Sequence, residues 1–291
     1  MLKPVSLIIG FCNDFDALSL LFAGLDRQTF KGFEVIIADD GSREQVVEQV
    51  GALIGRSHLA CKHVWHEDKG FRKNTILNRA VLASSGDYLV FIDGDCIPHR
   101  AFMEEHARHG KPRRVLAGRR VELSERISAM LTPDRVRAGH LENRLFPLMV
   151  WDSMLGRASF VENALHIPLG FLCRAINRGQ GSIIGSNYSL HKADLLAVNG
   201  FDERYHGPGL EDSDVEYRLR LNGVHVNRMR HMAIQYHVYH APRGYSAANS
   251  KILADTMKKR IAFTPHGIER ASVAAGENRQ PNRDDWGRGP V

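Results

Sequence analysis

The first hundred residues alternate between short apolar runs and segments with helical spacing. The apolar runs are rich in β-branched and aromatic residues, which is typical of buried strands. Alternation of this kind predicts an α/β fold, in which a mostly parallel central sheet is flanked by helices. The expected strands cover residues 5–11, 33–38, 60–66 and 88–92, and the expected helices cover residues 14–25, 43–53 and 73–83.

A polar cluster lies at the end of each expected strand. These clusters cover residues 10–14, 39–42, 66–73 and 93–99. Ligands of parallel sheets sit beyond the carboxyl ends of the strands. Four polar clusters at one edge of the sheet therefore predict a ligand site there, in preference to four unrelated turns.

Asp93 and Asp95 form the most informative of these clusters. They follow the apolar run YLVFI, so a buried strand is expected to present two carboxylates from an open turn. Hard divalent cations require oxygen ligands of this kind and often share them with a substrate phosphate. Asp-x-Asp alone is a weak signal, since the chain contains it at 14/16, 93/95 and 212/214. The position after a hydrophobic strand favours the pair at 93/95.

The rest of the chain departs from this alternation. Residues 124–181, which are rich in Arg, Leu, Met and Phe, are expected to form helices and loops that cover one side of the site. Further elements are expected at 185–200 (a strand and a short helix), 211–221 (a helix), 224–227 and 233–239 (strands) and 251–263 (a basic helix). Residues 276–291, rich in Gly, Pro, Arg and Asp, are expected to be disordered.

The composition is that of an ordinary soluble globular protein. Of the 291 residues, 43% are hydrophobic and 25% are charged, and no apolar stretch is long enough for a membrane span. The four cysteines have no CxxC spacing, which argues against a disulfide framework or a zinc knuckle. The N-terminal run MLKPVSLIIGFC is expected to be a strand and not a signal peptide, so the expected location is the cytoplasm.

The net charge of +6 is concentrated towards the C-terminus. Residues 243–291 hold nine Lys/Arg against five Asp/Glu, a net charge of +4. A basic end suggests nucleic acid or an acidic membrane surface as a partner, but a solvated basic tail explains it equally well. No interleaved aromatic residues or binding motif accompany it, so nucleic acid is not the expected partner.

The ordered set of motifs resembles the family 2 inverting glycosyltransferases with the GT-A fold. The similar segments are PVSLIIGFCND, FEVIIADDGS, HEDKGFRKNTILNRA, YLVFIDGDCIP, the stretch 185–223 and YHVYH. The later half is most similar to bacterial polysaccharide and chondroitin-type polymerase domains and to the β-1,4-galactosyltransferases. The loop GPGLED departs from many galactosyltransferases, because it lacks the tryptophan that they carry there.

The resemblance implies a Rossmann-like GT-A domain over residues 1–242, with a nucleotide-binding half (1–100) and an acceptor-binding half (101–242). Residues 243–291 would form a basic, partly helical extension. The implied reaction moves a hexose or N-acetylhexosamine from a UDP-sugar to a glycan or lipid-linked glycan. The implied role is in bacterial cell-surface polysaccharide or lipopolysaccharide synthesis. The implied location is the cytoplasm, with peripheral contact at the inner face of the cytoplasmic membrane as a further option.

The resemblance also implies a metal site. Asp95 is the first choice for direct ligation of Mn²⁺ or Mg²⁺, and Asp93 would hold the ribose or reach the metal through water. His237 is the expected third ligand, with His240 in reserve, and a histidine ligand favours Mn²⁺. His99 is a weaker candidate.

The Glu-Asp pair at the start of the expected helix 211–221 is the implied catalytic centre. Asp212 is expected to be the general base, and Glu211 to bind the acceptor sugar or orient the base. Asp214 is expected to act only as a negative charge at the start of the helix, since acids in a first helical turn complement the helix dipole.

The resemblance places uridine recognition at the end of the second strand. Asp39 or Asp40 should accept a hydrogen bond from uracil N3, with Asp39 preferred; the alternative is an Asx-turn that uses Gly41. The other expected nucleotide contacts are Asp68, Arg72 and, with less support, Lys73, together with Gly10, Phe11 and Asn13 in the pocket lining.

Three alternatives stay open at this point. A sugar nucleotidyltransferase also uses carboxylate-held Mg²⁺, but normally has a Gly-rich, Arg/Lys-bearing phosphate loop where this chain has GFCND. A receiver-like signalling domain built on Asp39 and Asp40 would be about half as long and would need a phospho-acceptor Asp at a later strand end. A non-catalytic nucleotide-binding or nucleic-acid-binding protein is the third.

Overall fold

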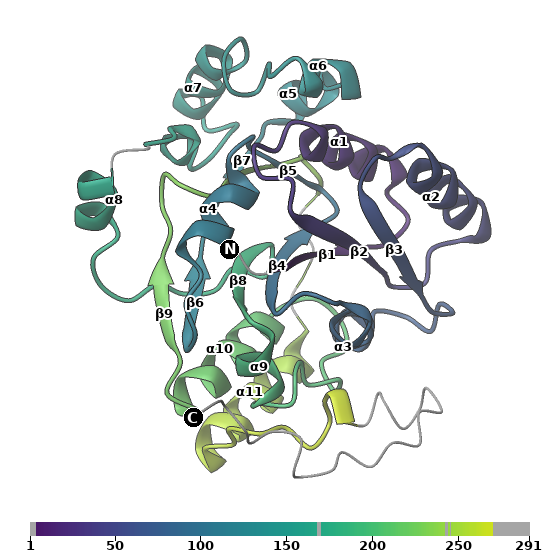
Figure 1. The fold of residues 1–291 in the computed structure, drawn as a ribbon, viewed down its shortest axis with the longest axis vertical. Coiled ribbons are helices and arrows are strands. Elements are labelled where there is room, and N and C mark those ends of the chain that lie inside the picture. The colour runs from purple at the N-terminus through teal and green to yellow at the C-terminus, as the bar shows by residue number, and fades with distance from the viewer. Residues whose placement is uncertain (1–3, 168–169, 242–243, 245, 270–291) are drawn as a thin grey trace.

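The computed structural model describes residues 4–167, 170–241, 244 and 246–269. A seven-stranded sheet in the order β3-β2-β1-β4-β8-β6-β9 forms its centre (Figure 1). Its strands are β1 (Val5–Phe11), β2 (Phe33–Asp39), β3 (Ala60–Trp65), β4 (Tyr88–Asp93), β6 (Arg114–Ala117), β8 (Asn187–His191) and β9 (His225–Arg228).

Within the strands that the structure describes, only β8 runs against the others of this sheet. The mostly parallel α/β sheet predicted from the alternation is therefore confirmed. In the parallel register, Gly10 lies opposite Asp93 and Phe11 lies opposite Asp39. The polar segments that follow these strands consequently meet at one edge of the sheet.

Helices cover both faces of the sheet, as expected from β1, whose successive residues are buried on both faces. Leu7 and Ile9 point to one face and Ile8 to the other, because successive side chains of a strand alternate. The first face is covered by α1 (Phe15–Asp26), α2 (Glu44–Arg56) and α4 (Phe102–His109). The second face is covered by α3 (Lys73–Ala83), α9 (Lys192–Leu196) and α10 (Glu211–Leu221) (Figure 1).

A smaller sheet continues the chain beyond β4. Its strands β5 (Cys96–Pro98), β10 (Ile234–His237) and β7 (Arg119–Glu122) lie in this order. β10 pairs antiparallel with β5 and parallel with β7, so that Cys96, His237 and Glu122 form a row across the sheet. This row positions the candidate metal site.

The middle of the chain forms helices and loops, as expected. Its elements are α5 (Glu125–Ala129), α6 (Pro133–Arg137), α7 (Phe146–Met154), the 3₁₀ helix η1 (Val161–Ala164) and α8 (Gly170–Ile176). They leave large apolar side chains exposed, including Trp151 (55%), Met154 (76%) and Phe171 (69%). No helix among the described residues is both long enough and apolar enough to cross a membrane.

The described part of the C-terminal segment packs on the domain. The basic helix expected at 251–263 is α11 (Ala247–Lys259), which contacts α10. Ile268 joins the core under the second face of the large sheet. The disorder expected for residues 276–291 concerns a stretch outside the described residues.

A buried ion pair inside α10 gives a stability prediction. Nε of Arg218 lies 2.8 Å from Oδ2 of Asp214, and both side chains are almost fully buried. Asp214→Ala should lower the free energy of unfolding by about 3–5 kcal/mol, because it leaves a buried guanidinium uncompensated. Lys259→Ala, which removes the exposed Lys259–Asp255 pair, is the control and should cost at most about 0.5 kcal/mol. Urea unfolding measures both, and equal losses would contradict the expectation.

Candidate active site

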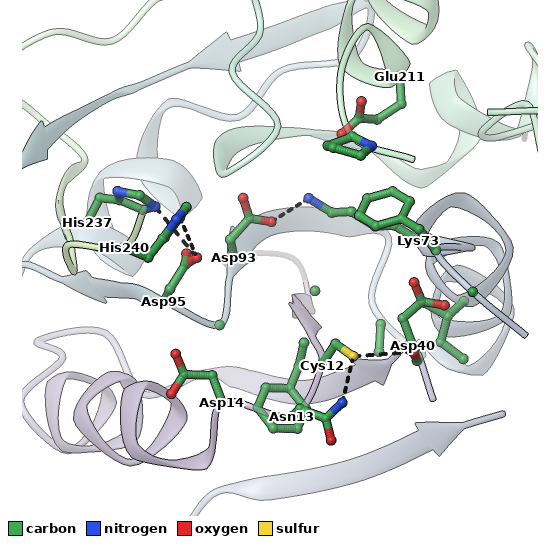
Figure 2. Close-up of a pocket in the computed structure, with 18 of the residues that line it drawn as sticks. Cys12, Asn13, Asp14, Asp40, Lys73, Asp93, Asp95, Glu211, His237 and His240 are labelled. Carbon is green, nitrogen blue, oxygen red and sulfur yellow. Dashed lines mark hydrogen bonds and ion pairs between the residues drawn. The ribbon is translucent and has the colours of Figure 1, made fainter. Parts of the chain in front are cut away.

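A cleft of about 1110 Å³ opens where β1, β2 and β4 end (Figure 2). Loops after these strands, the smaller sheet and the start of α10 form its wall. Its polar and charged lining residues are Cys12, Asn13, Asp14, Asp40, Asp68, Lys73, Asp93, Asp95, Arg120, Glu122, Glu211, His237 and His240, and Gly10 and Phe11 also line it. Most residues that the sequence pointed to therefore surround one cavity.

Asp95, His237 and His240 converge at one end of this cleft. Oδ2 of Asp95 lies 3.5 Å from Nε2 of His237 and 3.5 Å from Nε2 of His240. The pairing of β10 with β5 produces this contact, because His237 lies opposite Cys96, the neighbour of Asp95. Ligand atoms of Asp95, Cys96 and His237 lie within 4.8 Å of one another.

Glu122 holds the ring of His237 from the opposite side. Its Oε2 lies 2.7 Å from Nδ1 of His237, and its Oε1 accepts a hydrogen bond from Nε of Arg120 at 2.5 Å. A carboxylate on Nδ1 fixes the orientation of the ring and leaves Nε2 facing Asp95. Metal-binding histidines usually have such a partner.

The charges of this cluster depend on one another. Burial lowers the pKa of His237, but the carboxylates of Asp95 and Glu122 outweigh it and raise this pKa to about 9. Burial likewise raises the pKa of Asp95, but His237, His240 and Lys73 together bring it well below its usual range. The cluster therefore holds a proton tightly when it holds no cation.

These residues fit a divalent cation. Octahedral cations with ligands at about 2.1 Å keep neighbouring ligand atoms roughly 3 Å apart. The 3.5 Å separations around Asp95 are close to that value. A carboxylate together with an imidazole favours Mn²⁺ over Mg²⁺. Asp95 with His237 or His240 would hold such an ion, and its binding would replace the proton on the imidazole.

Asp93 has a different partner, the first residue of α3. Nζ of Lys73 lies 2.6 Å from Oδ1 of Asp93 (Figure 2). Gly10 lies against this lysine, since a Cβ atom on Gly10 would lie 3.2 Å from Cε of Lys73. Burial alone lowers the pKa of Lys73, but Asp93 and Glu211 raise it above its usual value. Lys73 is therefore a fixed positive charge near two carboxylates.

The two aspartates after β2 lie in different environments. Asp39 is fully buried, and its oxygens contact Nε2 of His63 and the backbone N–H of Ser42, both at 2.9 Å. Asp40 lines the cleft, with Oδ1 2.7 Å from Nε2 of His66. Asp39, the expected uracil contact, is therefore enclosed in the fold, and Asp40 is the aspartate of the pair that lines the cleft. The hydrogen bond from Ser42 places Asp39 in the turn after β2.

Asp68 and Arg72 flank Asp40. Asp68 lines the cleft and packs against Gly41, where a Cβ atom would lie 2.6 Å from the Cα of Asp68. The backbone N–H of Arg72 donates to Oδ2 of Asp40 at 2.8 Å, but its guanidinium donates to the carbonyl of Glu67. Arg72 thus supports Asp40, and its side chain does not line the cleft in this structure.

A second pocket of about 330 Å³ adjoins the cleft. The two cavities share Lys73, Asp93, Arg120 and Glu211. Asp212 lines the second pocket, where its Oδ2 accepts the backbone N–H of Gly185 at 3.2 Å and its Oδ1 that of Ser213 at 2.7 Å. The Glu-Asp pair therefore lies between the cleft and a smaller space beside it.

Glu211 is the carboxyl group of this pair that reaches both cavities. Its Oε2 is buried and has no hydrogen-bond partner among the described residues. Burial raises the pKa of Glu211; Lys73 offsets part of this rise, and Asp212 and Asp93 add to it. Glu211 therefore binds a proton more readily than an ordinary glutamate does.

The GPG loop before α10 sets the position of Glu211. Gly207, Gly209 and Leu210 have positive φ angles of 84°, 101° and 72°. Nδ2 of the buried Asn249, in α11, donates to the carbonyls of Gly207 and Gly209 at 3.1 and 2.8 Å. Helix α11 thus holds the loop that leads into the Glu-Asp pair.

Sequence reasoning missed Arg120, Glu122 and Asn249. Arg120 and Glu122 lie in a four-residue strand, which is too short for a detectable period, and Glu122 meets a histidine 115 positions later. No local signal could have found this contact. His99, the weaker metal candidate, is buried with Nε2 3.9 Å from Oε2 of Glu142, and it does not line the cleft.

Comparison with known families matches two successive parts of the chain. Residues 6–145 match the family described as "Glycosyl transferase family 2". Residues 175–241 match the family described as "N-terminal domain of galactosyltransferase". The boundary between the two lies before β8 and α10, so the second match contains the Glu-Asp pair and His237.

Curated relatives are glycosyltransferases. Chondroitin synthase of Escherichia coli is 24% identical over 277 residues, which are 90% of this chain and 39% of the relative. Validoxylamine A glucosyltransferase of Streptomyces hygroscopicus subsp. jinggangensis is 26% identical over 238 residues, 76% of this chain and 52% of the relative. The chain thus spans about half or less of the length of these relatives.

Solved structures share the fold. The structure of S. aureus TarS 1-349 matches with a TM-score of 0.55 and 15% identity, over 92% of this chain and 68% of that one. The structure of GalNAc-T7 with UDP, GalNAc and Mn²⁺ matches with a TM-score of 0.60 and 12% identity, over 88% of this chain and 48% of that one. These matches, with those above, favour a GT-A glycosyltransferase over the three alternatives.

The raised pKa of His237 gives a stability prediction for the metal-free protein. The pKa is about 9 in the folded chain against an ordinary value of 6.5, so the stabilisation is complete below pH 6.5 and is lost as the pH rises through 9. Between these limits the free energy of unfolding should fall by about 1–3 kcal/mol. Urea unfolding in the presence of a chelator measures this slope.

His237→Gln should abolish this slope, whereas His225→Gln, which changes an exposed histidine of β9, should retain it. Added Mn²⁺ should reverse the slope in the native sequence, because the ion binds the unprotonated imidazole. The same slope in His237→Gln and in the native protein would contradict the assignment.

Proposed function

We propose that this chain, which matches the glycosyl transferase family 2 model over residues 6–145 and shares the GT-A fold, is a metal-dependent inverting glycosyltransferase. It would transfer a hexose or N-acetylhexosamine from a UDP-sugar to a hydroxyl group of a glycan acceptor. The reaction would be a single displacement at the anomeric carbon.

The observation that carries this proposal is the cluster of Asp95, His237 and His240 at one end of a cleft that also contains Asp40. A UDP-sugar carries its diphosphate between the nucleoside and the sugar. A divalent cation held by this cluster would neutralise the charge that develops on the leaving diphosphate. The GalNAc-T7 structure, which shares the fold and contains UDP and Mn²⁺, supports the choice of a UDP-sugar and a divalent cation for this cleft.

The nucleotide would lie along the carboxyl ends of β1 and β2. Asp40 would accept the hydrogen bond from uracil N3, and Asp68 and Asn13 would complete the polar wall. Gly10 and Phe11 would contribute backbone and apolar contacts. Asp39 and Arg72 would act indirectly, because one stabilises the turn and the other supports Asp40 through its backbone.

The acceptor would enter the second pocket. Asp212 would remove the proton from the attacking hydroxyl, and Glu211 would bind the acceptor sugar or orient the base. Asp93 would hold the ribose or reach the cation through water, with its charge balanced by Lys73. Single displacement requires the base and the leaving group on opposite sides of the sugar. Figure 2 shows Glu211, the first residue of α10, on the other side of Asp93 from Asp95.

The acceptor would be a growing glycan, in bacterial surface polysaccharide or lipopolysaccharide synthesis in the cytoplasm. The similarity to chondroitin synthase, a polysaccharide-forming relative by its name, supports a glycan acceptor. A lipid-linked acceptor would bring the enzyme to the inner face of the membrane. The exposed Trp151, Met154 and Phe171 are suited to such peripheral contact.

UDP and Mn²⁺ together should raise the melting temperature of the native protein by several degrees, since both bind the folded state. Asp95→Ala should lose the metal-dependent part of this shift. Asp134→Ala, which changes an exposed carboxylate of α6, is the matched control and should keep it. Thermal denaturation measures the shift, and its absence in the native protein would contradict the donor site.

Asp212→Asn should lower kcat by about 10³ and leave the UDP–Mn²⁺ shift unchanged, because a general base acts only in the chemical step. Glu211→Gln should mainly raise KM for the acceptor. The rate of UDP release gives kcat and the acceptor KM of each variant. The donor for this assay is the UDP-sugar that raises the melting temperature most in a panel of UDP-sugars. If Glu211→Gln abolished turnover while Asp212→Asn kept it, Glu211 and not Asp212 would be the general base.

A further inference from the structure

Arg120 is a charged residue in the wall of the active site, and the reaction proposed above does not use it. It lies in β7 and lines both the cleft and the second pocket. Among the described residues, Lys73 is the only other lysine or arginine that lines either cavity, and Asp93 engages its ammonium group at 2.6 Å. Arg120 is therefore the remaining fixed cation of the site.

The register of the small sheet places Arg120 next to the candidate metal cluster. Arg120 and Glu122 point to the same face of β7, because side chains two positions apart in a strand share a face. Oε1 of Glu122 lies 2.5 Å from Nε of Arg120, and its Oε2 lies 2.7 Å from Nδ1 of His237. One carboxylate thus separates the guanidinium from an imidazole that would hold the cation.

The end of the Arg120 side chain is free to bind a ligand. A guanidinium offers five N–H donors, four of them on the terminal nitrogens, in a planar fork that matches a phosphate group. Among the described contacts, the side chain of Arg120 donates through Nε alone. Neither terminal nitrogen is buried, and the residue lines the cleft, so these donors are available to a ligand there.

The proposed reaction creates a negative charge close to this guanidinium. The bond between the anomeric carbon and an oxygen of the β-phosphate breaks, and the electron pair stays on that oxygen. The acceptor oxygen forms the new bond and gives its proton to Asp212. The lining of the cleft is itself acidic, since carboxylates outnumber basic side chains in it. A guanidinium with free donors beside the divalent cation would stabilise the charge that develops on the leaving UDP.

We propose that Arg120 binds the β-phosphate of the donor nucleotide beside the divalent cation and stabilises the leaving UDP. This rests on the proposed function, since it takes the cleft as the site of a UDP-sugar. Two other roles compete with it. In the first, Arg120 only fixes Glu122 and, through it, His237. In the second, Arg120 extends into the second pocket and contacts the acceptor.

The test compares the affinity of the full chain for UDP with its affinity for UMP, which lacks the β-phosphate. Mn²⁺ binding alone is measured first, and both nucleotides are then titrated at a Mn²⁺ concentration that saturates each variant. Arg120→Gln should weaken UDP binding about tenfold and leave UMP binding unchanged, because a charge-assisted contact to the β-phosphate is lost. Arg120→Lys, which keeps the charge without the planar fork, should show a smaller loss.

Two further variants serve as controls. Glu122→Gln removes the charge that joins Arg120 to His237; it should weaken Mn²⁺ binding and leave the ratio of UDP to UMP affinity at saturating Mn²⁺ unchanged. Arg119→Gln changes the neighbouring arginine, which lies on the other face of β7 and donates to the carbonyl of Ser182. It should alter neither Mn²⁺ binding nor this ratio.

Steady-state kinetics separates a phosphate contact from an acceptor contact. With the donor chosen by thermal shift, Arg120→Gln should lower kcat about 10²-fold, as the loss of a donor to a developing oxyanion does. The acceptor KM should stay at its native value, because the contact is to the leaving group.

Equal losses of UDP and UMP affinity in Arg120→Gln, or the same change of their ratio in Glu122→Gln, would overturn this inference in favour of the structural role. A raised acceptor KM with unchanged UDP affinity would overturn it in favour of the acceptor contact. If Arg120→Gln does not fold, Arg120→Lys decides, and a ratio equal to that of the native protein would overturn the inference. A native protein that binds neither UDP nor UMP would instead contradict the proposed function.

Discussion

The position of β10 between β5 and β7 is the constraint on which the candidate active site depends. Backbone pairing fixes His237 opposite Cys96 on one side and beside Glu122 on the other. A shift of one residue would turn His237 to the opposite face of the small sheet, away from Asp95. Because main-chain hydrogen bonds set this register, the fold itself places His237 beside Asp95.

The arrangement of Asp93 and Glu211 depends in turn on Lys73. It pairs with Asp93 at the end of β4, and Glu211 at the start of α10 also raises its pKa. These groups come from three elements, and the carboxylates would repel one another without the ammonium group. Lys73 also lines both cavities. Its ammonium group therefore lies between the cleft, where the leaving group would depart, and the second pocket, where the acceptor would enter.

Features with a local signal could be predicted from the sequence, and features set by pairing could not. The parallel strands and the carboxylates at 93/95 followed from apolar runs and their polar ends, and the fold was confirmed. The burial of Asp39 was not predicted, because β2 extends one residue beyond its expected end and keeps Asp39 inside the ladder. Glu122 was invisible, because its role depends on the register of strands far apart in the chain.

The candidate metal cluster draws its groups from distant parts of the chain, and this has a consequence for synthesis. Strands β1 to β4, with Asp95 just beyond them, emerge early, whereas β10 is the last strand of the described chain. An incomplete chain can pair the early strands around the nucleotide side of the cleft while its histidines are still missing. The candidate cation site would therefore be complete only after β10 has been synthesised, later than the strands that form the nucleotide side of the cleft.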